Sequence, residues 1–251
     1  MDLQKANMWK RFAAWLLDSM LLLVMAVGFI AALSSLLGYD THNVALQNAY
    51  ADYEDRYSVQ FNLTQDEYAA LSETELEAYQ QAYEALIADE TVLYEYSMVV
   101  NLSLAITTVG ILLGILCTDF VIPLLLKNGQ TLGKKAFGLG VVRPDSLRIT
   151  ALQMFVRTLL GKYTVETMIP VYIALTLIWG TLNMTGLIIC CALLLGQVIC
   201  ICVTRNRCAI HDQMAGTVVV DLASQKVFQS SQELIDYTNR IQAERAQRQD
   251  Y

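Results

Sequence analysis

The sequence has little charge and little proline. Only 16% of its 251 residues are charged, whereas soluble domains carry about 25%. Hydrophobic residues make up 55% of the chain, and the mean hydropathy is +0.40. This composition argues against an ordinary soluble enzyme and against a disordered chain. Three prolines exclude a collagen-like or proline-rich chain. A basic excess is also missing, because the net charge is -7. Nucleic-acid binding, which needs a basic surface, is therefore not expected.

Motifs for common cofactors and metals are missing as well. The sequence has no G-x-x-x-x-G-K-[ST] loop, no EF-hand order and no C-x₂-C pair. The cluster of Cys200, Cys202, Cys208 and His211 would fit a metal site, but cysteine as a small apolar membrane residue explains it better. All six cysteines lie outside residues 39–96, so no disulfide framework is expected. An enzyme is the weakest hypothesis, and we expect neither a cofactor nor a metal.

The hydrophobic residues gather in three blocks, at 12–37, 98–126 and 167–203. A membrane-spanning helix needs about 20 apolar residues, so each of the first two blocks suffices for one span. The first block is longer than the apolar region of about 7–15 residues in a secretory signal, which indicates an uncleaved span. The third block is either a hairpin of two spans that turns at residues 180–186 or one long tilted span with a flank.

The basic residues favour the hairpin. Of 17 lysines and arginines, 16 lie in three segments, which are the N-terminus, residues 127–162 and the stretch after residue 204. Short basic loops stay on the cytoplasmic side, so an even number of crossings separates these segments. We therefore predict four spans in a multi-pass protein of the cell membrane, expected in a bacterial plasma membrane. Both termini would be cytoplasmic and residues 39–96 external.

Residues 39–96 are strongly acidic, with 13 acidic residues and one basic residue. The net charge of -7 therefore divides into -12 in this segment and +5 elsewhere. Helices are predicted here by two capping boxes and one apolar stripe at helical spacing: Thr64 with Glu67, Ser72 with Glu75, and the stripe Leu76, Tyr79, Tyr83 and Leu86. We expect them to extend the first two spans and to pack with short helices. The segment is either a cation-attracting vestibule or ligand-binding cap, or a solvated insertion, and the solvated insertion is favoured.

Two acidic residues fall inside the apolar blocks, where a carboxylate costs about 2.5–3.5 kcal/mol unless it is paired or neutralised. Asp18 lies seven residues after Arg11, on the same helix face. Its expected partner is Arg11 or a basic residue of 127–162. Asp119 is the second buried acid, also near the cytoplasmic end. The two acids either share a proton or a cation, or they fasten helices to cytoplasmic basic residues.

The cytoplasmic segments contain a glycine-rich loop, an amphipathic helix and two short strands. Residues 139–142 and 217–220 are predicted to pair, because lone strands would leave backbone groups unpaired. That pairing would bring His211 and Asp212 near Lys134 and Lys135. Residues 148–162 are expected to form an interfacial helix with its apolar face in the headgroup region.

The predicted fold is thus an all-α polytopic membrane protein with four transmembrane helices, a cytoplasmic interfacial helix, a two-strand ribbon and an external helical insertion. Its segments are 8–38 (first span), 39–96 (acidic insertion), 97–127 (second span), 128–163 (Gly/basic loop and amphipathic helix), 164–204 (third and fourth spans), 205–228 (closing segment) and 229–251 (polar tail).

Three sequence motifs resemble the RDD family of membrane proteins. They are R-x-x-A-x-x-x-D at residues 11–18, G-Q-T-L-G-K-K-x-x-G at 129–138 and H-D-x-x-A-G-T-V-V at 211–219. The central motif contributes the loop candidates Gly129, Thr131, Gly133, Lys134 and Lys135. The arginine and two aspartates of the family name correspond to Arg11, Asp18 and Asp212, and Arg157 fits a basic position in the amphipathic helix. The resemblance implies transport of unidentified ligands, associated in some members with sodium–proton exchange.

Two functional hypotheses follow. In the first, a small-cation or proton-coupled transporter uses Asp18 as its key charge, with Asp119, Asp212, Arg11 and His211 along the pathway. In the second, the protein is a non-transporting scaffold that binds a partner through its external insertion or cytoplasmic loops. Beyond the lipid bilayer, the expected partner is a second copy of the chain or another membrane protein, because four spans make a thin pathway.

Overall fold

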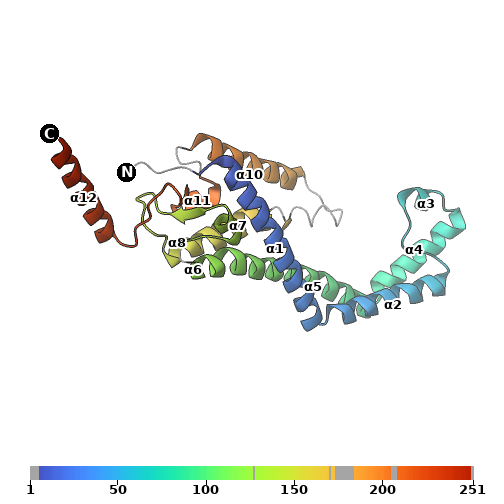
Figure 1. Ribbon diagram of the computed structural model, residues 1–251. Coiled ribbons are helices and arrows are strands. Elements are labelled where there is room, and N and C mark those ends of the chain that lie inside the picture. Colours follow the sequence, from blue (N-terminus) through green and yellow to red (C-terminus); the bar gives the residue numbers. More distant parts are fainter. Residues whose placement is uncertain (1–5, 127, 170, 173–183, 205–207, 250–251) are drawn as a thin grey trace. The chain divides into compact units, whose positions relative to one another are not determined.

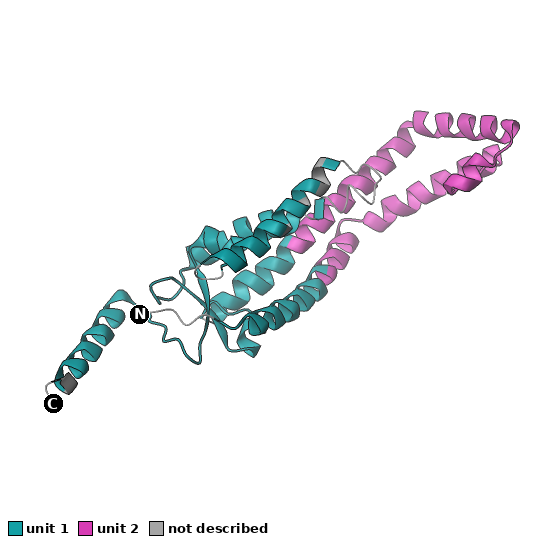
Figure 2. Ribbon diagram, turned by 90° about the horizontal axis from the view of Figure 1, so that it is seen from above, with its two compact units in different colours: residues 1–26, 112–251 teal, residues 27–111 magenta. Residues whose placement is uncertain are grey.

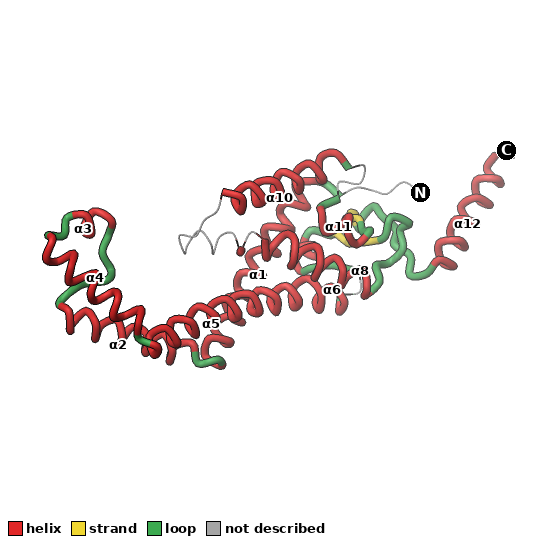
Figure 3. Tube along the Cα trace, turned by 180° about the vertical axis from the view of Figure 1, so that it is seen from behind, coloured by secondary structure: helices red, strands yellow, loops and turns green. Residues whose placement is uncertain are grey.

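The computed structural model describes residues 6–126, 128–169, 171–172, 184–204 and 208–249 (Figure 1). The described chain is mostly helical and includes one two-stranded sheet (Figure 3). It divides into two compact units, coloured separately in Figure 2. Unit 1 contains residues 1–26 and 112–251, and unit 2 contains residues 27–111.

Two helices are long and apolar enough to cross a membrane. The first is α1 (Met8–Leu36). The second runs without a break from Glu90 to Leu125 and consists of α5 (Glu90–Ile115), the π-helix η1 (Leu116–Val121) and α6 (Ile122–Leu125). Only 11% and 22% of their most apolar stretches are buried, unlike the core helix of a soluble protein. They match the first two predicted spans, although the second begins earlier than residue 97.

The third apolar block is described in part. The helix α10 (Met184–Val203) covers its second half. Residues 173–183, which hold the first part of the predicted turn, lie outside the described residues. The hairpin and the count of four spans therefore stay predictions.

Unit 2 contains the acidic insertion as three helices, α2 (Tyr39–Tyr57), α3 (Gln65–Ala69) and α4 (Glu73–Ala88). Both predicted capping boxes are confirmed, at the N-termini of α3 and α4. The first span does not continue into the insertion, which corrects our expectation, because Gly38 adopts φ +69° between α1 and α2.

The core of unit 2 is small and joins three helices. It consists of Leu46, Tyr53, Leu86 and Val92. The predicted stripe of α4 is partly wrong, because Tyr83 is 49% exposed whereas Ala82 is fully buried. The buried face of α4 is therefore defined by Ala82 and Leu86, which are four residues apart and so share one helix face.

Unit 1 contains the predicted ribbon. Strand β1 (Leu139–Val142) pairs antiparallel with β2 (Val218–Asp221), with Leu139 opposite Asp221. The pairing is confirmed, and β2 begins one residue later than expected. The ribbon packs on the start of the first span, since Ala14 of α1 joins Leu139, Val141 and Val219 in one core.

The remaining elements of unit 1 are short helices and a C-terminal helix: α7 (Leu132–Ala136), α8 (Ala151–Phe155), the π-helix η2 (Val156–Met168), α11 (Ile210–Ala215) and α12 (Ser231–Gln249). The predicted amphipathic helix at 148–162 begins only after Thr150, which forms a capping box with Gln153. It then continues as η2 to Met168. Its basic residues Arg157 and Lys162 point into unit 1 and not to a headgroup region, because each pairs with a buried aspartate.

Candidate functional site

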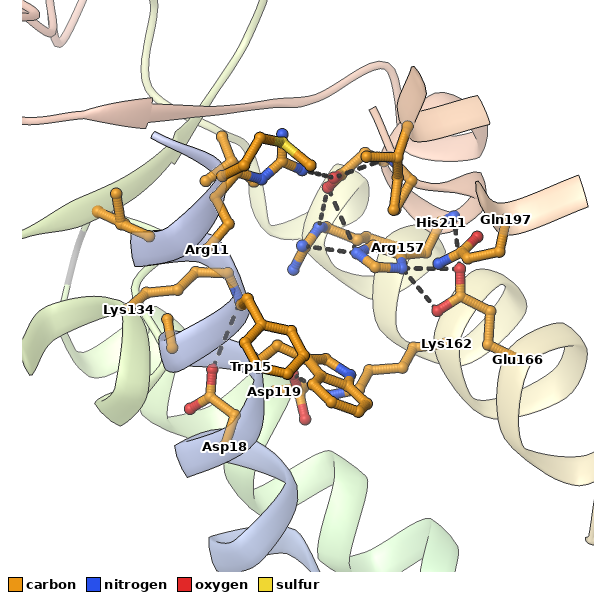
Figure 4. A pocket seen from close by; sticks show the side chains of 18 residues that line it. Arg11, Trp15, Asp18, Asp119, Lys134, Arg157, Lys162, Glu166, Gln197 and His211 are labelled. Carbon is orange, nitrogen blue, oxygen red and sulfur yellow. Dashed lines mark hydrogen bonds and ion pairs between the residues drawn. The ribbon is translucent and has the colours of Figure 1, made fainter. Parts of the chain in front are cut away.

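A cavity of about 330 Å³ lies in unit 1 and is lined by most of the charged residues that the motifs supply (Figure 4). Its carboxylates are Asp18, Asp119, Glu166 and Asp212. Its cations are Arg11, Lys134, Arg157 and Lys162. These side chains come from α1, η1, α7, η2 and α11, so the site is assembled from segments far apart in the sequence.

Asp18 binds the glycine-rich loop of residues 129–138 and holds it against the first span. Its carboxylate accepts a hydrogen bond from Thr131 Oγ1 at 2.5 Å and one from the Gly133 backbone N–H at 2.8 Å. Thr131 is the N-cap of α7, so Asp18 satisfies a backbone donor that the start of this helix leaves open. The Lys134 ammonium lies farther away, at 3.7 Å.

Gly133 permits this close approach. A Cβ atom at this position would lie 2.4 Å from the Ala14 carbonyl oxygen and 2.8 Å from Asp18 Cγ. The small residues of both motifs, Ala14 and Gly133, therefore let the loop rest directly on the helix that carries Asp18. Gln130, also in the loop motif, donates from Nε2 to the Leu139 carbonyl oxygen at 2.7 Å and ties the loop to β1.

Asp212 connects the last motif to η2 and to the first span. It is 1% exposed and accepts a hydrogen bond from Arg157 Nε at 2.8 Å. Arg11 of α1 lies 3.7 Å away on the other carboxylate oxygen. Burial alone would raise the pKa of Asp212, but Arg157 outweighs it and holds this pKa well below its usual range. Arg11 therefore pairs with Asp212, and Asp18 has its nearest cation in the loop.

His211 lies between Asp212 and another carboxylate of the cavity, that of Glu166. Its Nδ1 lies 2.7 Å from Glu166 Oε2, and its Nε2 lies 2.9 Å from Arg157 Nη2. Because a guanidinium can only donate, Nε2 must accept, and the hydrogen bonds require the Nδ1–H tautomer. Gly161 allows α11 to lie against η2, since a Cβ there would be 2.6 Å from His211 Cβ.

Asp119 forms an ion pair with Lys162. Its Oδ1 lies 2.6 Å from Lys162 Nζ, and its Oδ2 accepts a hydrogen bond from Thr118 Oγ1 at 2.8 Å. Asp18 and Asp119 thus line the same cavity, but each carboxylate has its own set of donors. A proton or cation shared directly between them is not what the described contacts show.

Both π-helices contribute to the cavity, in agreement with the tendency of π-helical turns to occur at functional sites. Asp119 lies in η1, and three charged residues of the cavity lie in η2. In η2 the i→i+5 pattern brings Arg157 and Lys162, five residues apart, to the same cavity. With 3.6 residues per turn the two side chains would diverge.

Lys134 is the cation with the most perturbed environment outside the spans. Its side chain is 14% exposed. Burial, followed by repulsion from Arg157, lowers the pKa of Lys134 to about 8 against the opposing attraction of Asp18. Lys135, its neighbour in the motif, is exposed and does not line the cavity. The predicted approach of His211 and Asp212 to this loop therefore applies to Lys134 alone.

Some residues of the site were not among the predicted ones. Arg157 and Lys162 were placed in the amphipathic helix at 148–162, and Glu166 was placed in a span. Gln197 of α10 also lines the cavity, and its Oε1 accepts a hydrogen bond from the Ile210 backbone N–H at 3.0 Å. The one sequence signal for Glu166 was its position as a charged residue directly before an apolar block. Gly129, in contrast, serves the loop turn with φ +62° and does not line the cavity.

Within the described part of the chain, no three His, Cys, Asp or Glu side chains are grouped to hold a metal ion. No curated protein and no solved structure matches the sequence significantly. The family model described as "RDD family" matches residues 5–216, which is most of the chain and includes the first two motifs and residues 211–216 of the third. The protein is therefore a membrane protein of the RDD family.

Proposed function

We propose that unit 1 transports a small ion. In this transport a cation exchanges with a proton at the charged cavity, and Asp18 is the key charge. The observation that carries the proposal is that Asp18 of α1 and Asp119 of η1 belong to the two long apolar helices and line one cavity. Intramembrane carboxylates are costly, and where they occur they commonly mark ion pathways.

The pairing of the acids supports two different roles. Asp212 is held by an arginine, which keeps its charge at any physiological pH and bonds in a fixed fork geometry. Asp18 and Asp119 have lysine partners at 3.7 Å and 2.6 Å. A lysine ammonium is a compact point charge, so a small cation can take its place as the counter-charge of a carboxylate. Binding of one cation at the carboxylate with release of one proton from the lysine ammonium leaves the net charge of the cavity unchanged.

A second function is favoured by a different observation. Asp18 already accepts from Thr131 and Gly133, and Gly133 is packed against Ala14. These contacts are those of a structural clamp, which would make the protein a scaffold that binds a partner through residues 39–96 or its cytoplasmic loops. For transport, we propose that a second copy or another membrane protein completes the pathway.

Ion flux separates the two functions. Full-length protein in proteoliposomes with an internal pH dye is given an inward sodium gradient, and we expect proton efflux above that of empty vesicles. Asp18→Asn should reduce it to the empty-vesicle rate, whereas Lys135→Gln, a change at an exposed lysine of the same loop, should leave it intact. Wild-type flux equal to that of empty vesicles, for sodium and for potassium, would overturn the transport proposal.

The clamp makes an additional prediction in the same samples. If Asp18 acts only as a clamp, Asp18→Asn should lower the unfolding temperature and wild type should show no flux. If transport is correct, Asp18→Asn protein that elutes as a folded species in size-exclusion chromatography should still fail to exchange ions. Crosslinking in membranes then tests the scaffold: a partner lost on deletion of residues 40–95 supports it.

A further inference from the structure

The cavity also combines a buried ammonium with an exposed apolar wall. Met8, Phe12 and Trp15 of α1 line it and are 38%, 55% and 58% exposed. The rings of Phe12 and Trp15 are 5.8 Å apart between centroids. Because α1 has the length and composition of a membrane span, we expect this aromatic wall to face the region where acyl chains and headgroups meet.

Lys134 is loosely held at the charged end of the cavity. The described residues give its Nζ two contacts, Thr131 Oγ1 at 3.3 Å and Asp18 Oδ2 at 3.7 Å. An ammonium has three donors, and a charge-assisted bond to a carboxylate is usually about 2.7–2.9 Å long. Asp18 makes its shorter bonds to neutral donors, so it compensates Lys134 only in part.

The four carboxylates that line the cavity equal its four cations in number, so an anion here would bind through the long contacts of Lys134 and not through an excess of positive charge. Four neighbouring carboxylates and four other charged or titratable groups line the cavity around Lys134: Asp18 and Arg11 on α1, Asp119 on η1, Arg157, Lys162 and Glu166 on η2, and His211 and Asp212 on α11. Asp119 and Asp212 each have a cationic partner at 2.8 Å or less, and His211 donates from Nδ1 to Glu166 at 2.7 Å. Burial and then repulsion from Arg157 lower the pKa of Lys134, and the attraction of Asp18 does not offset them.

We propose that the cavity binds the anionic headgroup of a membrane lipid, with its phosphate at Lys134 and its acyl chain along Phe12 and Trp15. Lys162, 20% exposed in the same cavity, is placed to donate a second bond. The site goes beyond the proposed function and is occupied whether or not the protein moves an ion. A lipid is favoured over a free anion because the cavity wall that carries the exposed rings is continuous with an apolar span.

Lipid retention tests the proposal. Full-length protein in a neutral detergent is incubated with equal amounts of dioleoylphosphatidylglycerol and dioleoylphosphatidylcholine, and the retained lipid is measured by native mass spectrometry. Wild type and Lys135→Gln should retain the anionic lipid preferentially. Lys134→Gln should weaken this binding by about tenfold or more, since a charged hydrogen bond is lost, and Lys134→Arg should restore most of it.

Three results would overturn the inference. These are equal retention of the two lipids by wild type, equal retention of the anionic lipid by Lys134→Gln, and stabilisation of wild type by inorganic phosphate as large as that by the anionic lipid. The last result would assign the site to a free anion. The two wild-type comparisons need no variant, so they decide the question even if Lys134→Gln does not fold. They are also independent of flux.

Discussion

At the scale of single residues, the three motifs act through close packing as well as through charge. Asp18 and Gly133 form one contact, because the carboxylate binds the glycine N–H and the missing side chain makes room for it. Arg11 and Asp212 form another between the first and last motifs. The three residues that give the family its name therefore make two contacts between distant segments, and these residues line a common cavity.

Gly133→Ala should destabilise the protein, because its Cβ would lie 2.4 Å from the Ala14 carbonyl oxygen. We expect a loss of about 1–3 kcal/mol, the usual cost of overpacking, measured by thermal unfolding in detergent. Gly196→Ala is the matched control, since a Cβ there has no atom within 4 Å. An equal effect of the two variants would contradict the packing role of Gly133.

Lys134 should make the protein more stable as the pH rises. Its pKa is about 8 in the folded protein and about 10.4 in an unfolded chain. Between these values the unfolded state binds more protons, so the unfolding free energy increases with pH. Unfolding temperatures of wild type should therefore gain on Lys134→Gln between pH 8 and pH 10. Parallel profiles for the two proteins would argue against a destabilised ammonium.

At the scale of elements, the sequence predicted the regular parts of the fold well. The capping boxes of α3 and α4, the antiparallel ribbon and two long apolar helices all follow from local patterns of spacing and hydrophobicity. The π-helix η2 does not, because a helical pattern in a sequence is recognised by a spacing of 3.6 residues per turn. Arg157 and Lys162 were therefore expected in an interfacial amphipathic helix, although both enter the cavity.

The partners of the buried charges were equally hard to predict. The seven-residue spacing of Arg11 and Asp18 suggested a pair on one helix, with a basic residue of 127–162 as the alternative. Arg11 pairs instead with Asp212, and Asp18 contacts Thr131 and, at 3.7 Å, Lys134 of that segment, all more than 100 residues away in the chain. Such contacts depend on tertiary packing, and no local spacing contains them. The sequence did identify Asp18 and Asp119 as buried charges, since a charge inside an apolar block is visible without a structure, but the buried Arg157 and Asp212 lie outside the blocks.

The capping box of α4 offers a test at the element scale. Ser72 accepts from the Glu75 N–H, and Glu75 accepts from the Ser72 N–H. Ser72→Ala should cost about 0.5–2 kcal/mol, seen as lower helicity of unit 2 on heating, whereas Ser72→Asp should retain the cap. If Ser72→Ala and Ser72→Asp unfold alike, the cap does not stabilise α4.

At the scale of the whole molecule, the acidic and basic residues are segregated along the sequence. Residues 39–96 carry a net charge of -12 and the rest of the chain +5. Positive loops remain on the cytoplasmic side of a membrane, so this division predicts which segments share a side. It also predicts that the cavity, with its motif residues, lies at the cytoplasmic end of the first span.

Thiol labelling tests this topology. Ser72→Cys should react with a membrane-impermeant maleimide in intact cells, since residues 39–96 contain no cysteine of their own. Ser224→Cys, at an exposed position after β2, should react only after the membrane is permeabilised. Labelling of both sites in intact cells, or of Ser224→Cys alone, would contradict the predicted sidedness.

The most direct test of the central claim, that paired charges from distant motifs build one cavity, is a double-mutant cycle on Arg157 and Asp212. Unfolding free energies are measured for wild type, Arg157→Gln, Asp212→Asn and the double variant. Each single change should be strongly destabilising, because it leaves a buried charge unpaired. The double variant should lose less than the sum of the two, with a coupling of about 1–3 kcal/mol. Additivity within about 0.5 kcal/mol would contradict the pair and with it the described cavity.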